Sequence, residues 1–310
     1  MTNHRWNSLP AAGLPVNANP AEPASNAAAP ISSPERTVPL TDRHAGSGAP
    51  GEVWVIVVAG GSGSRYGGPK QFELLAGERV IDWSIAAASL CADGVVVVVS
   101  AHSDLALARG ELLAHAKIRA VIHGGASRSA SVRNGLAAVP DSASVIVVHD
   151  AARPLASPQL FSDSVQAIRN GAGAAVTAIP VVDTIKRTDG SLVTGTVDRT
   201  NLVAVQTPQA FNAALLRQAH AEGSDATDDA GLVEALGAAV VIVPGDVRNL
   251  KLTTPEDLII LEAFAADLDL SPGIQDSEES PALTAALAAI EARFRKPLAA
   301  APASGADVLG

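Results

Sequence analysis

Continuous apolar runs recur along the middle of this chain, and turn residues separate them. The first run, Val53–Ala59, is followed directly by Gly60 and Gly61. Such a run is typical of a strand that is buried on both faces, as in a parallel sheet. Three more runs follow the same pattern, over Val95–Val99, Val121–Ile122 and Val145–Val148.

Between these runs lie segments with helical spacing of apolar residues, over Val80–Leu90, Ser103–Ala116 and Ser129–Val139. Strands that alternate with helices of this length form right-handed βαβ units. The pattern therefore predicts an α/β fold with a Rossmann-like, doubly wound, mostly parallel sheet.

The second half of the chain continues this pattern after one interruption. Residues 181–200 combine polar residues and glycines without a helical period, so we expect a protruding β-arm here. Before the arm we expect a helix at Pro158–Asn170 and a strand at Ala174–Ile179. After it we expect a strand at Leu202–Val205, helices near Asn212 and after Thr227, a strand at Val240–Val243 and a helix from Pro255.

The two ends of the chain differ from this core, which we place at residues 51–270. Residues 1–50 hold 8 of the 20 prolines and lack apolar periodicity, so we expect a disordered extension. Residues 271–310 begin with an acidic linker. Leu283, Leu287, Ile290 and Phe294 then share one helical face, which fits a helix docked on the core, on a partner, or left in solvent.

Charge and cysteine content narrow the class of protein. The net charge of −10 argues against general binding to nucleic acid or anionic membranes, although it permits a local anion site. The single cysteine, Cys91, excludes an internal disulfide, and we expect a structural thiol.

There is no apolar stretch of about 20 residues and no secretory signal pattern, so we expect a soluble, cytoplasmic protein. We also expect no second enzyme domain after Phe264.

The strongest chemical signal is the glycine-rich loop that follows the first strand, Ala59-Gly-Gly-Ser-Gly-Ser-Arg65-Tyr-Gly-Gly-Pro-Lys70-Gln71. Glycines at the carboxyl end of a parallel strand let backbone N–H groups approach phosphate oxygens, and Arg65 and Lys70 add positive charge. A Walker loop is excluded because Pro69 follows Gly68. A dinucleotide fingerprint is excluded because Tyr66 occupies the place of the third glycine. The alternative to a phosphate-binding loop is a glycine-rich connector in which Arg65 and Lys70 are two solvated cations.

This loop resembles the nucleotide loop of the nucleotidyltransferases that use sugar phosphates. Further blocks narrow the resemblance to the cytidylyltransferases that act on methylerythritol phosphate and their ribitol-phosphate relatives. These blocks are Gly124–Val132, His149–Pro154, Val182–Arg187, Gln206–Phe211 and Asn249–Thr253. The resemblance runs in family order from Val53 to about Phe264. It implies transfer of CMP from CTP to 2-C-methyl-D-erythritol 4-phosphate, with release of pyrophosphate, in isoprenoid synthesis.

The resemblance also implies roles for residues of this chain. The catalytic residues would be Arg65 and Lys70, which stabilise charge at the α-phosphorus, and Lys251, which contacts phosphate. The CTP-binding residues would be Ala59, Gly60, Gly61, Gly63, Ser64, Gly125, Ser131, Asp150 and Ala151. The acceptor-binding residues would be Arg153, Thr184, Arg199 and Thr207, with Lys186 nearby. His149 is expected to be structural, because an ionised phosphate needs no general base.

Several of these assignments have a purely structural alternative. Asp150 fits a helix cap that pairs with Arg153, and Lys186 and Lys251 fit solvated lysines at a strand edge. The chain also departs from the family pattern in two places. Arg65 and Lys70 are closer together than usual, and Gly60 replaces a more usual alanine.

The cofactor and the partners follow from the same resemblance. We expect Mg²⁺ or another divalent cation held mainly by phosphates, since the histidines, carboxylates and cysteine lack the spacing of a dedicated metal site. A homodimer with composite sites is expected, because the family's arm crosses to the partner subunit.

The remaining alternatives concern the substrate and the class of protein. Ribitol 5-phosphate is the nearest alternative acceptor: His149–Pro154 favours methylerythritol phosphate, whereas Gln206 favours ribitol phosphate. A sugar-1-phosphate nucleotidyltransferase and a regulatory module without turnover are the wider alternatives.

Overall fold

The computed structural model describes residues 51–61, 63–100, 105–113, 115–221 and 223–266. The expected N-terminal extension and C-terminal linker and helix therefore lie outside the described residues. Among the helices of the described part, none is long and apolar enough to cross a bilayer.

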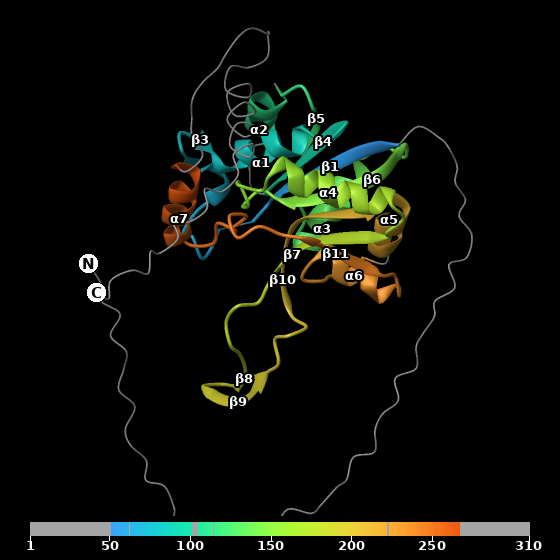
Figure 1. The fold of residues 1–310 in the computed structure, drawn as a ribbon. Helices are drawn as coiled ribbons and strands as arrows, with labels where there is room; N and C mark the ends of the chain where they lie inside the picture. The colour runs from blue at the N-terminus through green and yellow to red at the C-terminus, as the bar shows by residue number, and fades with distance from the viewer. Residues whose placement is uncertain (1–50, 62, 101–104, 114, 222, 267–310) are drawn as a thin grey trace, which may run out of the picture. The chain divides into compact units, whose positions relative to one another are not determined.

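A seven-stranded sheet forms the centre of the fold (Figure 1). Strand β1 pairs in parallel with β4 on one side and with β6 on the other, so that Val55 lies beside both Val95 and Val147. Only β10 runs antiparallel to its neighbours, β6 and β7. In spatial order the strands are β11 (Val240–Pro244), β7 (Ala174–Pro180), β10 (Val203–Asn212), β6 (Ala143–Asp150), β1 (Glu52–Ala59), β4 (Gly94–Val99) and β5 (Ile118–His123).

Helices cover both faces of the sheet, which confirms the doubly wound, mostly parallel α/β fold. One face packs against α1 (Val80–Ser89), α2 (Leu105–Leu112) and α4 (Pro158–Arg169). The other face packs against α3 (Arg128–Ala137), α5 (Ala213–Ala221) and α6 (Asp229–Ala235). Alternate residues of β1 enter the two cores: Val55 and Val57 pack on the first face, and Trp54 and Ile56 on the second. This double burial explains the unbroken apolar run in the sequence.

A third apolar cluster lies beside the sheet, and Tyr66 of the glycine-rich loop packs against it. The short strands β2 (Leu74–Leu75) and β3 (Glu78–Arg79) form a hairpin, and α7 (Pro255–Ala266) packs against it. Leu75 and Leu261 are fully buried in this cluster. A single 3₁₀ turn, η1 (Lys70–Phe72), precedes the hairpin. We did not predict β2 and β3, because two-residue strands carry no period.

The expected β-arm is present. Strands β8 (Ile185–Asp189) and β9 (Leu192–Val197) form a separate antiparallel hairpin that projects from the sheet (Figure 1). The predicted strand at Leu202–Val205 is too short. Strand β10 continues through the Thr207–Gln209 block to Asn212, with a register shift after Val205.

Cys91 is half-buried against the first core, and its thiol donates to the carbonyl of Ala88. Burial raises the pKa of this thiol to about 12. A thiolate, the reactive form of cysteine, is therefore disfavoured here. This placement fits the structural role that we expected.

Candidate active site

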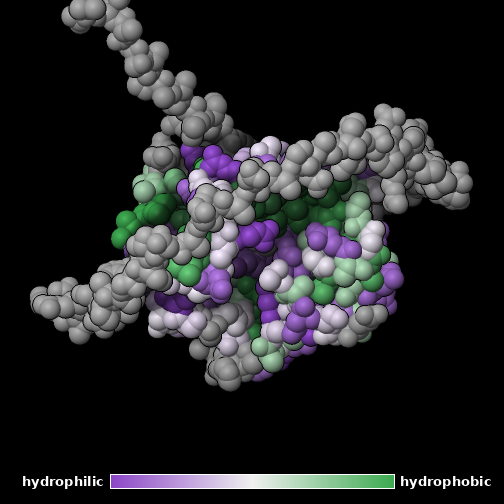
Figure 2. All heavy atoms as spheres, turned by 90° about the horizontal axis from the view of Figure 1, so that it is seen from below, coloured by the Kyte–Doolittle hydropathy of each residue, from purple (hydrophilic) through white to green (hydrophobic). Residues whose placement is uncertain are grey.

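The candidate site lies at the carboxyl ends of four parallel strands. β1 ends at Ala59, β4 at Val99, β5 at His123 and β6 at Asp150. The chain places β4 and β5 on one side of β1 and β6 on the other, so the strand order reverses at this point. Open α/β sheets bind ligands in the crevice outside such a switch point. Hydrophilic residues gather around a central hollow on the face seen in Figure 2.

The glycine loop after β1 folds back on Gly63. The carbonyl of Gly63 accepts hydrogen bonds from the backbone N–H groups of Tyr66 and Gly67, both at 2.8 Å, and of Gly68 at 3.3 Å. Gly63 has φ +64°, and a Cβ atom there would lie 1.7 Å from the carbonyl oxygen of Gly68. Only glycine fits this turn. The turn brings Lys70 back to the site despite the short spacing from Arg65.

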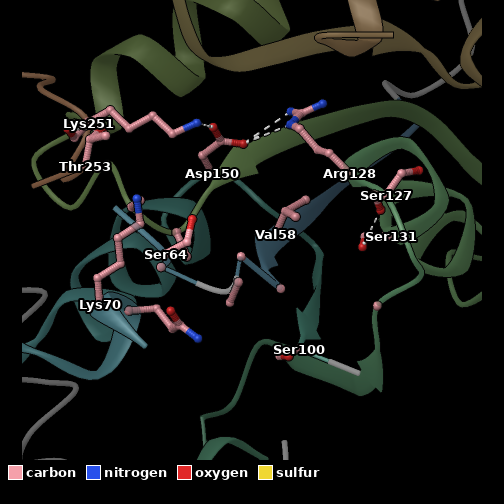
Figure 3. A pocket seen from close by; sticks show the side chains of 18 of the residues that line it. Val58, Ser64, Lys70, Ser100, Ser127, Arg128, Ser131, Asp150, Lys251 and Thr253 are labelled. Carbon is pink, nitrogen blue, oxygen red and sulfur yellow. Dashed lines mark hydrogen bonds and ion pairs between the residues drawn. The ribbon is translucent and has the colours of Figure 1, made fainter. Parts of the chain in front are cut away.

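A cavity of about 750 Å³ opens over this loop (Figure 3). All twelve residues that we predicted for catalysis and CTP binding line it. They are Ala59, Gly60, Gly61, Gly63, Ser64, Arg65, Lys70, Gly125, Ser131, Asp150, Ala151 and Lys251. Sequence reasoning missed nine other described residues as lining residues: Val58, Gln71, Ser100, Gly124, Ala126, Ser127, Arg128, Ala152 and Thr253.

Positive charge dominates the cavity wall. In the described part of this wall there are four cationic side chains, those of Arg65, Lys70, Arg128 and Lys251, and one carboxylate, that of Asp150. Burial lowers the pKa of Lys70, and the nearby charges of Lys251 and Arg65 lower it further. Because these cations repel one another, an anion that enters between them is stabilised. The cavity therefore suits a highly charged anion such as a triphosphate.

Asp150, the last residue of β6, joins two of these cations. Lys251 Nζ lies 2.5 Å from Asp150 Oδ2, and Arg128 Nη2 lies 3.2 Å from Oδ1. The two cations reach the carboxylate from opposite sides (Figure 3). Burial alone would raise the pKa of Asp150, but the charges of Arg128 and Lys251 hold it well below its usual range. Asp150 is therefore ionised at neutral pH. Neither structural alternative describes Asp150 and Lys251, because the carboxylate pairs with Lys251 and Arg128 inside the cavity.

The opposite wall is formed by the start of α3, where backbones approach closely. A Cβ atom at Gly125 would lie 2.5 Å from Cβ of Ala130, so a side chain does not fit there without a shift. The hydroxyl of Ser131 accepts from Gly125 N at 3.1 Å and donates to the Ser127 carbonyl at 2.9 Å. Ser131 therefore holds the shape of the loop, and the loop presents backbone groups to the cavity.

A second cavity of about 490 Å³ adjoins the first and shares Lys251 and Thr253 with it. Arg153 lines this second cavity. Its guanidinium donates to the carbonyl of Asn249 at 2.7 Å, and burial lowers its pKa. The side chain of Gln206 also lines this cavity, where it bonds to the backbone N–H and carbonyl of Asp246.

The other predicted acceptor residues do not line either cavity. Within the arm, Thr184 directly precedes β8 and Arg199 follows β9, and both are exposed. The guanidinium of Arg199 donates to the carbonyl of Val182. Lys186, on β8, donates to Thr196 across the hairpin at 2.6 Å. Within one chain, the arm residues are therefore not gathered with Arg153.

Thr207 lies beneath the site instead of on its surface. Its side chain is buried, and its hydroxyl accepts from the backbone N–H of Asp150 at 3.0 Å. The same hydroxyl lies 3.1 Å from Nδ1 of His149. His149 is fully buried, and burial lowers its pKa to about 3, so the ring is neutral. Both residues thus hold the end of β6 in place.

We expect Thr207→Val to act mainly on the fold. Valine keeps the volume of threonine but leaves the N–H of Asp150 without its acceptor, which costs about 1–3 kcal/mol of unfolding free energy. Denaturant unfolding followed by circular dichroism measures this cost. The KM of the acceptor should change by less than about threefold, a shift of under 1 kcal/mol. A large rise in that KM at unchanged stability would instead place Thr207 against the acceptor.

The donor set does not form a metal cage. Among the described residues, no group of three or more His, Cys, Asp or Glu side chains is placed to hold a metal ion. Asp150 is the only carboxylate among the described residues that line the first cavity, and both of its oxygens are paired with cations. A divalent cation at this site would therefore need most of its ligands from substrate and water. Mg²⁺ accepts such ligands readily.

Comparison with known proteins gives a consistent result. Residues 53–267 match the family described as IspD: 2-C-methyl-D-erythritol 4-phosphate cytidylyltransferase. The chain is 46% identical over 219 residues to the 2-C-methyl-D-erythritol 4-phosphate cytidylyltransferase of Nocardia farcinica; the match covers 69% of this chain and 94% of that relative. It is 43% identical over 229 residues to the bifunctional enzyme IspD/IspF of Solidesulfovibrio magneticus. The match covers 69% of this chain but spans only 57% of that relative.

Solved structures agree with the sequence comparison. The 2-C-methyl-D-erythritol 4-phosphate cytidylyltransferase of Thermus thermophilus superposes with a TM-score of 0.59 at 36% identity; the match covers 69% of this chain and 99% of that one. The 4-diphosphocytidyl-2C-methyl-D-erythritol synthase of Anaerococcus prevotii gives a TM-score of 0.61 at 28% identity, with 70% and 96% covered.

Proposed function

Because the chain belongs to the 2-C-methyl-D-erythritol 4-phosphate cytidylyltransferase family, we propose that it transfers CMP from CTP to 2-C-methyl-D-erythritol 4-phosphate. One observation supports this proposal most directly. A cavity lined by a glycine loop and four cations shares Lys251 with a second cavity that holds Arg153. The first cavity suits the triphosphate, and the second suits a smaller phosphate.

The reaction joins the two phosphates at the shared wall. A phosphate oxygen of the acceptor attacks the α-phosphorus of CTP in line, a new P–O bond forms, and the bond to the β-phosphate oxygen breaks. Pyrophosphate leaves with the electron pair of that bond. Arg65 and Lys70 line the first cavity from the glycine loop, and the shared residue Lys251 lies near enough to lower the pKa of Lys70. Their charges stabilise the transition state more than the ground state, because negative charge accumulates on the leaving oxygen.

Mg²⁺ is the proposed cofactor, bound mainly by the triphosphate oxygens and water. When bound, it would neutralise charge on the leaving pyrophosphate. The paired state of Asp150 supports this assignment, since the residues described at the cavity include this one carboxylate.

Turnover with two acceptors tests the proposed function. We expect pyrophosphate release with CTP and Mg²⁺ when 2-C-methyl-D-erythritol 4-phosphate is present, and much slower release with ribitol 5-phosphate. The relatives described above carry the methylerythritol name, which favours this order. Replacing CTP with ATP should abolish release, because we expect the backbone groups beside Gly125 to read the edge of cytosine, which a purine does not present. Faster turnover with ribitol 5-phosphate would be consistent with the proposed mechanism but would identify ribitol 5-phosphate as the acceptor.

A homodimer is the proposed assembly, and the arm supports it. Val182, Leu192 and Val193 expose 77%, 71% and 62% of their surfaces on the arm. Exposed apolar side chains on a projecting hairpin favour burial against another subunit. Thr184 and Arg199 lie on the same arm, outside both cavities of their own chain. In the proposed dimer they complete the acceptor site of the partner subunit.

Subunit mixing tests this composite site. Lys70→Ala removes a group of the chain's own cavity, and Arg199→Ala removes a group that would act in the partner. We expect each variant alone to be nearly inactive. A refolded mixture should regain up to about a quarter of wild-type activity, because half of the subunits pair as heterodimers and each heterodimer keeps one intact site. A mixture with no regain, in dimers shown by light scattering to have exchanged subunits, would contradict the composite site.

A further inference from the structure

The loop that faces the nucleotide is supported from behind by a segment far away in the sequence. We call Gly124–Ser131 the recognition loop and Ser224–Asp229 the backing segment. The two touch at several points near the surface. Ser127 Oγ donates to Asp225 at 2.7 Å, and Ser129 Oγ accepts from the N–H of Ala226 at 3.2 Å. Asp225 also lies 3.6 Å from Arg133 of α3. The start of α3 is thus fixed to the backing segment.

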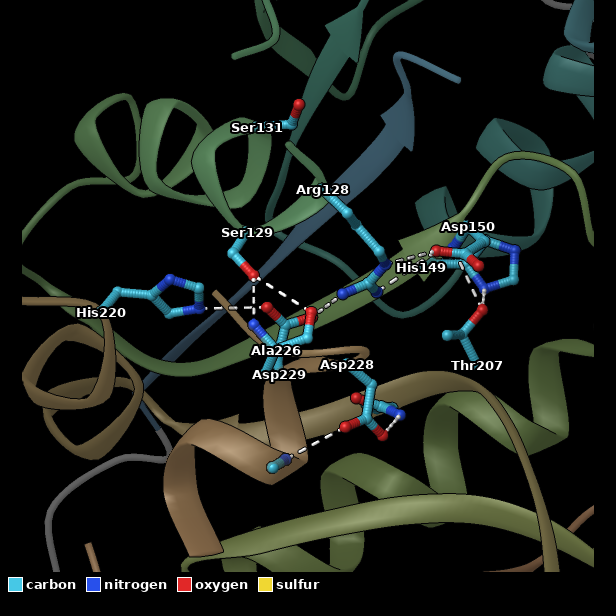
Figure 4. A network of polar contacts seen from close by, with 12 residues as sticks. Arg128, Ser129, Ser131, His149, Asp150, Thr207, His220, Ala226, Asp228 and Asp229 are labelled. Carbon is cyan, nitrogen blue, oxygen red and sulfur yellow. Dashed lines mark hydrogen bonds and ion pairs between the residues drawn. The ribbon is translucent and has the colours of Figure 1, made fainter. Parts of the chain in front are cut away.

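A buried ion pair makes the deepest of these contacts (Figure 4). Arg128 Nη1 lies 2.7 Å from Asp229 Oδ2, and the side chain of Asp229 is fully buried. The other oxygen of Asp229 lies 3.0 Å from Nε2 of His220, on α5. Burial alone would lower the pKa of Arg128, but the charges of Asp150 and Asp229 raise it. Arg128 is therefore a fixed cation between two carboxylates.

Through this arrangement, the buried carboxylate of Asp229 contacts a side chain that lines the cavity without lining the cavity itself. Arg128 lines the cavity and contacts Asp150 there, whereas Asp229 does not line it. A guanidinium presents its donors in a rigid, planar fork, so two carboxylates at different edges define its orientation. Without Asp229, only Asp150 would direct the guanidinium, and the start of the recognition loop would lose its buried anchor.

We propose that Asp229 is a positioning residue that sets CTP affinity by holding Arg128, and through it the recognition loop, in the nucleotide-binding orientation. This inference rests on the proposed function. It predicts an effect on binding more than on chemistry, because Asp229 contacts Arg128 and His220, whereas the proposed catalytic residue Lys251 pairs with Asp150 and Lys70 donates to Leu252. The neighbouring Asp228 supplies a matched control: it caps α6 through Gly231 N and accepts from Gln209, without contact to Arg128.

The test compares Asp229→Asn with Asp228→Asn in the full-length protein. Asp229→Asn should raise the CTP dissociation constant, measured by calorimetry, and the KM for CTP about tenfold, equivalent to ~1.4 kcal/mol. The kcat should stay within about twofold, a change of under ~0.5 kcal/mol. Asp228→Asn loses a carboxylate from the same segment but should leave CTP affinity unchanged. An equal loss of affinity in both variants would reduce the role of Asp229 to general support of α6 and overturn the proposal.

A double-mutant cycle separates positioning from stability. If Asp229 acts through Arg128, then Asp229→Asn should add little to the loss caused by Arg128→Gln, whereas independent effects would add. Additive losses would overturn the proposal. Should Asp229→Asn fail to fold, Asp225→Ala serves instead, because the side chain of Asp225 is 61% exposed and its loss leaves the core intact. This variant should weaken CTP binding about threefold at unchanged kcat, and unchanged binding would count against the proposal.

The outcomes also distinguish this inference from the proposed function. Wild-type protein that binds no CTP would remove the proposed function itself. If the wild-type protein binds and turns over CTP and the Asp229→Asn variant binds CTP with unchanged affinity, only the proposed role of Asp229 would be contradicted.

Discussion

Replacing Lys70 with alanine should lower kcat by about 10²–10³-fold, a loss of ~3–4 kcal/mol of transition-state stabilisation. Lys70 Nζ enters the first cavity beside Lys251 and Arg65, and its ammonium donates to the carbonyl of Leu252. Charge at this position opposes the negative charge that grows on the leaving pyrophosphate. Steady-state kinetics at saturating CTP and acceptor measures the effect. Lys117→Ala removes the same charge from an exposed turn and should leave kcat unchanged.

The pH dependence gives an independent check on Lys70. Burial and the neighbouring cations place its pKa below the usual value, so the ammonium loses its proton at a lower pH than a solvated lysine. The kcat/KM for CTP, which reports the free enzyme, should therefore fall as pH rises through that lowered pKa. Lys70→Arg should move this alkaline limb to higher pH, because a guanidinium stays charged. An alkaline limb that is identical in Lys70→Arg would assign it to another group.

The same shift fixes the sign of the stability effect. Because the folded pKa of Lys70 is lowered, the unfolded chain binds more protons between the folded and unfolded pKa values, and stability rises with pH across that window. At neutral pH the folded state holds a charge that burial and its neighbours disfavour. Lys70→Ala should therefore unfold at the same denaturant concentration as wild type or a higher one. Inactivity of the variant would then not be due to unfolding.

Gly63→Ala should reduce kcat/KM for CTP by at least about 100-fold, because misplacement of reacting groups by about 1 Å has an effect of this size. An alanine at φ +64° costs ~1–2 kcal/mol, and its Cβ would overlap the carbonyl oxygen of Gly68 at 1.7 Å. The turn must open to admit the methyl group. Arg65 and Lys70, on either side of Gly68, would then leave their positions. Kinetics with varied CTP measures the loss.

Gly60→Ala is the matched control for this prediction. A Cβ atom at Gly60 would meet Ser131 Oγ and the Val99 carbonyl oxygen at 3.6 Å, which is ordinary van der Waals distance. Alanine is also the more usual residue at this position in the resemblance described above. We therefore expect nearly full activity. A loss as large as that of Gly63→Ala would show that methyl groups anywhere in the loop obstruct the phosphates. The positive φ of Gly63 would then not be the cause of the effect.

The sequence predicted the buried strands best. The observed β1 begins at exposed Glu52, one residue before the predicted run, and from Val53 onward its burial between the two cores explains the apolar residues. β5 was recognised only at Val121–Ile122, since Arg119 faces solvent and interrupts the apolar pattern. β10 was predicted too short because Thr207-Pro208-Gln209 resembles a turn. Distant partners satisfy its polar groups instead: Thr177 donates to the Pro208 carbonyl at 3.1 Å, and Asn249 to that of Thr207 at 2.9 Å.

For the candidate site too, some residues could be predicted from the sequence and others could not. Residues that act from one contiguous motif were found, because glycines and cations at the end of a strand have a direct physical meaning. Arg128 stood inside a recognised block, yet its role depends on Asp229, which is 101 residues away in the sequence. Thr207 was assigned to the acceptor because a hydroxyl in a conspicuous motif gives no sign of its own burial. Charge pairing and burial between distant segments follow only from the fold.

Lys251 and Thr253 line both cavities, so in the proposed reaction the two substrates would meet beside these residues. The product of the proposed reaction is one molecule that occupies both cavities at once. Linking two bound fragments raises affinity by about 10²–10⁴ over either fragment alone. Product dissociation should then limit turnover more than the chemical step does. As a result, kcat should fall as solvent viscosity rises. A stable analogue with a methylene group in place of the bridging oxygen would be retained in the same way and would act as a tight inhibitor.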